Sequence, residues 1–207
     1  MLNNITITDI TRTKKGFNAL FSEDGFMFSV DDVVLYKNNI SIGSCFSQQE
    51  LTCIEKQSLT AKAVDKCYTL LANRIHSRKE LYDKLCRFYD GETAAAAVEK
   101  MEELGLVDDE KFAYLKAEYL LNVKKQSFRA IKRKLSSLGV DKNIIDNVLL
   151  NFRAEDQTEE ILYLLRTKYA TRLSRPEKVV ASLVRKGFRY GEIKKAMELS
   201  DIFLQEY

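Results

Sequence analysis

The sequence of 207 residues has little of what most enzyme sites are built from. It holds one histidine, His76, so a site with two or three His ligands or a His-centred proton relay has almost nothing to work with. Its eight glycines form neither G-x-G-x-x-G nor G-x-x-x-x-G-K-[ST], and no G-x-S-x-G elbow occurs. We therefore expect a protein that is not an enzyme, with no catalytic residue and no cofactor.

The four cysteines include no C-x-x-C pair, whereas a structural zinc site would need close pairs. We expect no metal and four reduced, mostly buried thiols. No apolar run approaches the roughly 18 residues of a membrane span, and the N-terminus lacks the order of a signal peptide. These features predict a cytoplasmic protein without membrane contact.

Residues 1–57 have a different pattern from the rest. Isoleucines alternate with threonines near the start, and an Asp-Gly pair at Asp24 separates two short apolar runs, which is typical of a β-hairpin. The segment VVLYKNNISIG predicts either another strand or a short helix that opens at Asp31. We expect a small β-containing module here.

From about residue 48 the sequence predicts helices. Three S-x-x-E segments, which begin at Ser47, Ser77 and Ser174, have the form of capping boxes, and the only proline, Pro176, falls in the first turn after Ser174. Asp108, before another helical run, is expected to be a helix N-cap.

The helical part repeats itself about every 50 residues. Pairs of apolar residues lie four apart in three similar segments, and their second members, Leu85, Leu135 and Leu183, are separated by 50 and 48 positions. A glycine, Gly139 or Gly187, follows the last two of these, as a left-handed helix stop requires. The pairs expected to face inward are Leu81 and Leu85, Ile131 and Leu135, and Val179 and Leu183.

These patterns predict a mostly α fold with three tandem three-helix repeats. One such unit buries only a small core, so we expect neighbours to pack into an elongated, curved array. The predicted ranges are the N-terminal module with the start of a linking helix (1–57), repeat 1 (58–107), repeat 2 (108–153) and repeat 3 (154–207).

The net charge of +3 hides a strong polarisation. Residues 90–118 hold nine acidic and three basic residues, whereas residues 124–142 hold one acidic and seven basic, and residues 166–195 hold two acidic and ten basic. Such basic clusters suit phosphate backbones, an acidic protein surface, or simply a solvated helix face. The candidate contact residues are Lys124, Lys125, Arg129, Lys132, Arg133, Lys134, Arg175, Lys178, Arg185, Lys186 and Arg189.

Most of the aromatic residues are expected in the core or at its rim. Phe188 and Tyr190 lie beside basic residues just after Gly187, so they are candidates to stack on a base or to meet a partner. His76 is interpreted as structural.

Two segments in order, LANRIHSRKELYDKL and LGLVDDEKFA, resemble the RecX family of bacterial regulators of the RecA recombinase. The resemblance rests on residues in the first two repeats: Leu71, Arg74, Ser77, Glu80, Leu81, Lys84, Leu85, Leu104, Gly105, Asp108, Asp109, Phe112, Ala113, Ile131, Leu135, Gly139 and Val140. It covers about residues 60–207 well and 1–57 weakly. Phe128 departs from the family, which commonly has Gly, Pro or another small residue near this helix start.

The resemblance implies a non-enzymatic modulator that binds RecA and its filament on single-stranded DNA, fits along the filament groove and suppresses ATPase and strand exchange. Several family members also bind DNA directly, and the basic repeats would then face the filament or DNA. We expect a monomer. The alternative function is a stand-alone nucleic-acid-binding helical-repeat protein that uses one unit as a helix-turn-helix.

Overall fold

The computed structural model describes residues 4–152 and 157–200, and the chain divides into two units. The first unit is built from residues 1–75 and 81–107, and the second from residues 76–80 and from 108 onward. The boundary predicted between residues 153 and 154 lies outside the described residues.

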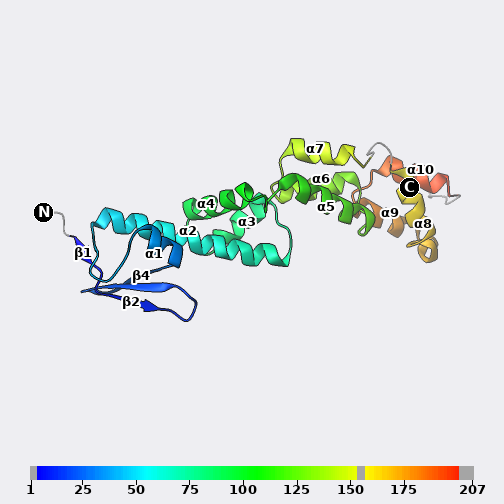
Figure 1. Ribbon diagram of the computed structural model, residues 1–207. Helices are drawn as coiled ribbons and strands as arrows, with labels where there is room; N and C mark the ends of the chain where they lie inside the picture. The colour runs from blue at the N-terminus through cyan, green and yellow to red at the C-terminus, as the bar shows by residue number, and fades with distance from the viewer. Residues whose placement is uncertain (1–3, 153–156, 201–207) are drawn as a thin grey trace. The chain divides into compact units, whose positions relative to one another are not determined.

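The β-rich start of the chain forms two small antiparallel sheets in the first unit (Figure 1). The larger has the order β2-β3-β4, with strands β2 (Asp9–Arg12), β3 (Asn18–Ser22) and β4 (Gly25–Val30). In the smaller sheet, β1 (Ile5–Thr6) pairs with β5 (Cys45–Phe46). The predicted hairpin is confirmed, because β3 and β4 pair across a tight turn that Gly25 closes with a φ of 106°.

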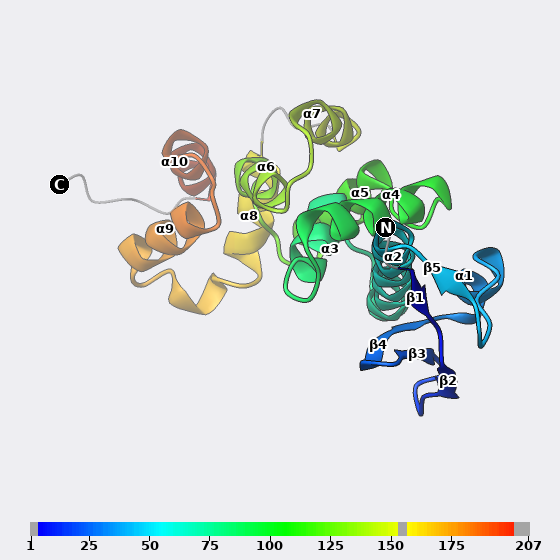
Figure 2. The ribbon, with the colours of Figure 1, turned by 90° about the vertical axis from the view of Figure 1, so that its left-hand side faces the viewer.

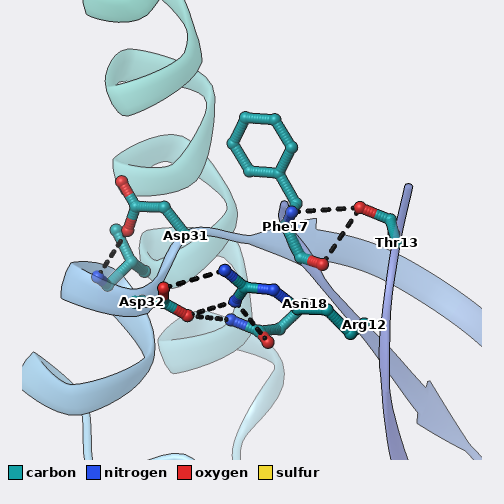
Figure 3. Close-up of polar contacts among 7 residues, drawn as sticks. Arg12, Thr13, Phe17, Asn18, Asp31 and Asp32 are labelled. Carbon is teal, nitrogen blue, oxygen red and sulfur yellow. Dashed lines mark hydrogen bonds and ion pairs between the residues drawn. The ribbon is translucent and has the colours of Figure 1, made fainter. Parts of the chain in front are cut away.

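The segment that predicted either a strand or a helix folds as helix α1 (Asp32–Lys37). The Asp31 side chain decides between the two, because its Oδ1 accepts a hydrogen bond from the N–H of Val34 and caps the helix. Asp32, at the first helical position, accepts from Asn18 Nδ2 at 2.8 Å and from Arg12 Nη2 at 3.0 Å (Figure 3). The Arg12 and Asn18 hydrogen bonds lower the pKa of Asp32, and they fasten α1 to strands β2 and β3.

Helix α2 (Gln48–Asn73) links the sheets to the first helical cluster. Its predicted capping box is confirmed, since Ser47 Oγ accepts from the N–H of Glu50 and the Glu50 carboxylate accepts from the N–H of Ser47. Buried residues of the sheets pack beside Ile54, and those further along α2, such as Ala63 and Cys67, join a second cluster that includes Leu81 and Leu85.

Eight further helices follow α2 within the described residues. Their bounds are α3 (Arg78–Leu85), α4 (Gly91–Glu103), α5 (Asp109–Asn122), α6 (Phe128–Ser137), α7 (Lys142–Leu150), α8 (Thr158–Arg166), α9 (Pro176–Arg185) and α10 (Tyr190–Glu198). Buried residues of α5, α6 and α7 form one cluster, and those of α8, α9 and α10 form another. The predicted mostly α fold with a small N-terminal β-module is confirmed. The longest helix is α2, and none in the described part of the chain is long and apolar enough to span a membrane.

The predicted inward positions are confirmed. Leu81, Leu85, Ile131, Leu135 and Leu183 are completely buried, and Val179 is 1% exposed. Residues four apart lie on the same face of a helix, so each pair presents one apolar stripe to its own cluster.

The start of α3 and the start of α6 make equivalent contacts in the second unit. Ser77 Oγ donates to the carbonyl of Leu138 at 2.6 Å, and the N–H of Ser127 donates to the carbonyl of Lys186 at 3.1 Å. Each serine also caps its own helix, because its Oγ accepts from the N–H of the residue three positions later. The two carbonyls belong to the residues just before Gly139 and Gly187.

A second pair of contacts accompanies the first. The N–H of Arg78 donates to Asp109 Oδ1, and the N–H of Phe128 donates to Gln157 Oε1, both at 2.8 Å. The acceptors lie at the starts of α5 and α8. Each helix start is therefore fastened twice to residues about 30 and 60 positions later in the chain.

The third predicted capping box is wrong. Helix α9 begins at Pro176 with Arg175 as its N-cap, and no side chain caps it. For Ser174 to be the cap, Arg175 would have to be helical, but proline disfavours helical backbone in the residue before it.

The prediction of mostly buried thiols is also wrong. Cys67 is buried, whereas Cys45, Cys53 and Cys86 are exposed, and none of the four is in a disulfide. In α2, the helix spacing places Cys67 on the inward face and leaves Cys53 exposed.

Candidate functional site

The α6 face is the outward side of α6 that carries Arg129 and Arg133. Ile131 and Leu135 point into the core, so Arg129 and Arg133, one turn apart, lie on the opposite side and are exposed. Neither guanidinium has an ion-pair partner among the described residues. Two like charges at this spacing repel, so an anionic surface laid across both would be favoured.

The flanks of α6 differ from each other. Lys132 forms an ion pair with Asp146 of α7, in which both side chains are a little under half exposed. Lys134, on the other flank, is exposed. The partnered Lys132 thus contributes less uncompensated charge than Arg129, Arg133 and Lys134.

Lys124 and Lys125, just beyond the end of α5, lie over aromatic rings. Lys124 Nζ is 5.5 Å from the ring centroid of Tyr119, and Lys125 Nζ is 5.1 Å from that of Tyr163 in α8. Attraction to the electron-rich ring faces holds both ammonium groups near the surface of the second unit. Lys125 has a φ of 51°, so the chain turns sharply there before α6.

Lys186 is half-buried and is engaged within the protein. Its Nζ donates to the carbonyl of Lys124 at 2.6 Å and to that of Lys125 at 3.3 Å. Burial, with help from the nearby charges of Lys168 and Lys124, lowers the pKa of Lys186. Among the predicted contact residues, Lys186 is therefore the one whose side chain is most clearly used within the protein, where it joins the end of α9 to the segment after α5.

The α9 groove is a cavity of about 760 Å³ along α9 in the second unit. It brings together three predicted residues, Arg175, Lys178 and Arg185, and adds Arg172, which the prediction missed. Its other lining residues are Tyr169, Thr171, Ser174, Val179, Ala181 and Ser182. Arg172 belongs to the basic run before α9, and it lines the same groove as Lys178 and Arg185. The path of the chain between α8 and α9 can be followed in Figure 2.

Arg189 and Arg129 line a second, smaller hollow of about 60 Å³ together with Gln157. Gln157 is 4% exposed, and its Nε2 has no hydrogen-bond partner among the described residues, while its Oε1 accepts from the N–H of Phe128. Glu192 also lines this hollow, and its carboxylate accepts from the N–H of Arg189. The hollow thus pairs two guanidinium groups with one carboxylate, which leaves an excess of positive charge.

The prediction that Phe188 could stack on a base or meet a partner is wrong, because its ring is 3% exposed and packs in the cluster of α8, α9 and α10. Tyr190 is 59% exposed and remains available. His76 is buried, and Asp108 caps α5 through the N–H of Lys111, as predicted. The described residues contain no group of three or more His, Cys, Asp or Glu that could hold a metal ion.

No family model matches the chain. Similar curated proteins nevertheless exist, and they bear the name Regulatory protein RecX. The protein from Listeria monocytogenes serotype 4a (strain HCC23) is 24% identical over 193 residues, which cover 89% of this chain and 71% of the relative. The protein from Clostridium perfringens (strain SM101 / Type A) is 26% identical over 196 residues, which cover 89% of this chain and 91% of the relative.

Two solved structures share the fold. A crystal structure of regulatory protein RecX has a TM-score of 0.69 and 21% identity, and the match covers 94% of this chain and 99% of that one. A crystal structure of RecX from Lactobacillus salivarius has a TM-score of 0.57 and 24% identity, and it covers 70% of this chain and 98% of that one. The resemblance drawn from the sequence is thereby confirmed.

Proposed function

Because this chain is a homologue of RecX regulatory proteins and has their fold, we propose that it binds the RecA recombinase on single-stranded DNA and lowers its ATPase and strand-exchange activity. The observation that carries the proposal is the similarity to proteins named Regulatory protein RecX over 89% of the chain. Regulation by binding needs no catalytic group.

The α6 face supplies a physical means of binding. Arg129 and Arg133 project from a helix whose other side is fixed in the core, so their positions are set by the fold. Complementary charge speeds the encounter with an acidic surface and fixes its register, even where it adds little affinity. We therefore assign contact with the RecA protein to the α6 face.

We also propose that the chain is built from the β-module (1–57) and three helical repeats (58–107, 108–153 and 154–207). The equivalent contacts at Ser77 and Ser127 support this division, because a repeating chain reuses the same contact between successive units. Several weak contacts along a repetitive filament would then add up to a useful affinity.

The test is a double charge reversal, Arg129→Glu with Arg133→Glu. It replaces two unpartnered cations by anions, so binding to RecA filaments should weaken by more than about tenfold. Affinity is measured by co-sedimentation with RecA assembled on single-stranded DNA. The matched control is Lys14→Glu with Lys15→Glu, which makes the same change of charge at two exposed positions in the first unit.

A control variant that binds normally while the α6 variant fails assigns the contact to the α6 face. Equal affinity of the folded α6 variant and the unchanged protein would remove the α6 face from the interface.

The second candidate is a stand-alone nucleic-acid-binding protein, which the four cations of the α9 groove favour. Such a protein would bind bare DNA tightly and with a steep dependence on salt, and it would have no stronger effect on RecA-coated DNA.

A further inference from the structure

We propose that the α9 groove binds the sugar–phosphate backbone of a single nucleic-acid strand. The inference deepens the proposed function, since it assigns the nucleic-acid strand of a RecA filament to one site. Its test uses the protein and DNA without RecA, so the two proposals can fail separately.

The charge of the groove is of one sign. Arg172, Arg175, Lys178 and Arg185 line it, and no acidic residue in the described part of the chain does. All four side chains are exposed, and none has an ion-pair partner among the residues that the structure describes. Uncompensated cations held around one cavity attract an anionic chain and release its counterions on binding.

The spacing of the cations suits an extended ligand. Lys178 and Arg185 are seven positions apart, so they lie on the same side of α9 and about 10 Å apart along its axis. Arg172 and Arg175 precede the helix and also line the groove. A ligand with one charge would meet one end of this arrangement, whereas successive phosphates can meet both.

Hydroxyl groups complete the lining. Thr171 and Ser174 are exposed, and Ser182 Oγ lies 2.8 Å from the hydroxyl of buried Tyr169 at the groove. Hydroxyls and cations are the groups that proteins use on phosphate oxygens, and these contacts do not depend on the base. Tyr169 is the one aromatic residue among the described residues of the lining, and it is 2% exposed, so these residues offer no ring to a base. We therefore expect binding without sequence preference.

The concave shape separates this site from the α6 face. A cavity of about 760 Å³ can hold a strand against these cations, whereas a flat acidic protein surface would leave that volume unfilled. The α6 face projects outward and can meet such a surface directly. The two basic regions of the second unit thus fit different ligands.

The test measures binding of fluorescein-labelled oligothymidylate by anisotropy at several salt concentrations. The groove variant is Lys178→Gln with Arg185→Gln, and the matched control is Lys14→Gln with Lys15→Gln, which removes two charges at exposed positions in the first unit. Each phosphate neutralised on a single strand contributes a slope of about −0.7 in log affinity against log salt. The groove variant should lose about tenfold in affinity, and its slope should become shallower by about 1.4, while the control changes little.

A steric variant tests the cavity without altering charge. Ala181 is exposed and lines the groove, so Ala181→Leu should fill part of it and weaken binding as well. Thermal unfolding and circular dichroism establish that each variant is folded. Equal losses in the groove and control variants, or undiminished binding by both groove variants, would overturn the proposal.

Two further arms separate the ligand classes. Polyglutamate should compete poorly with oligothymidylate, and equal competition would show a site for any polyanion and overturn the assignment. If the groove variant binds oligothymidylate normally but no longer acts on RecA, the groove contacts protein, and only the proposed function survives. If it loses DNA binding and still inhibits RecA, the groove assignment stands and the filament is bound elsewhere.

Discussion

Gly187 follows the last turn of α9 with a φ of 92°, a backbone conformation that residues with a side chain rarely adopt. A Cβ at this position would lie 2.5 Å from Ser127 Oγ and 2.8 Å from Ala130 Cβ, at the start of α6. Gly187 is therefore required both for the turn and for the close approach of the two helix ends. The same holds for Gly139, where a Cβ would lie 2.3 Å from Lys79 Cβ.

Gly187→Ala should cost about 2–4 kcal/mol of stability, since backbone strain and overpacking add. Gly191→Ala is the control in the same unit, because no neighbour lies within 4 Å of its Cβ and its backbone is helical. That change should be neutral or stabilising by up to about 1 kcal/mol. Urea unfolding measures both, and equal effects would contradict the close contact with Ser127 and Ala130.

Cys67 provides a test of burial in the first unit through pH. Burial raises the pKa of its thiol from 9.0 to about 11. A raised folded pKa contributes stability that is fully present below pH 9 and is lost as the pH rises through about 11. At about 1.4 kcal/mol for each pKa unit, the loss is at most about 3 kcal/mol.

The measurement is the difference in unfolding free energy between the natural protein and Cys67→Ala, from pH 8 to pH 11. The difference should shrink as the pH rises, because only the natural protein must keep a thiol protonated in the core. A difference that stays constant over this range would show that the thiol of Cys67 is accessible to water.

At the scale of the helix, the residue spacing in α6 determines which side chains are buried and which are exposed. Leu135→Ala removes a completely buried side chain and should cost about 2–5 kcal/mol. Ser136→Ala, the next residue, is exposed and should change stability by less than about 0.5 kcal/mol. Thermal and urea unfolding compare the two, and normal stability of Leu135→Ala would refute the inward face of α6.

Helix periodicity and caps made much of the helical fold predictable. The stripes at Leu85, Leu135 and Leu183 and the cap at Asp108 depend on residues close in sequence, so local pattern suffices for them. The predicted cap at Ser174 is wrong because the S-x-x-E pattern takes no account of Pro176, which disfavours helical backbone at Arg175.

The candidate site was less predictable, because availability depends on residues distant in sequence. Lys186 looks like any surface lysine until the carbonyl groups of Lys124 and Lys125, some 60 positions away, are found at its Nζ. Phe188 is in the core because residues of α8 and α10 surround it. Neither the engagement of Lys186 nor the burial of Phe188 can be predicted from the charges of neighbouring residues in the sequence.

At the scale of the whole molecule, the composition predicts a protein without the common kinds of active site, and the charge runs predict either an anionic partner or a solvated helix face. The cavity could not be predicted from the sequence, because the α9 groove is lined both by residues of α9 and by residues between 169 and 175. The α6 face and the α9 groove together give the second unit two basic regions of different shape. We assign one to RecA and the other to the DNA strand that RecA covers.

The most direct test of this account is RecA's ATPase rate on single-stranded DNA, measured against increasing amounts of this protein, with its binding to the same bare DNA measured in parallel. The account predicts suppression at concentrations too low to coat the bare DNA. An unchanged ATPase rate at concentrations that saturate bare DNA would contradict action on the filament and favour a stand-alone nucleic-acid-binding protein.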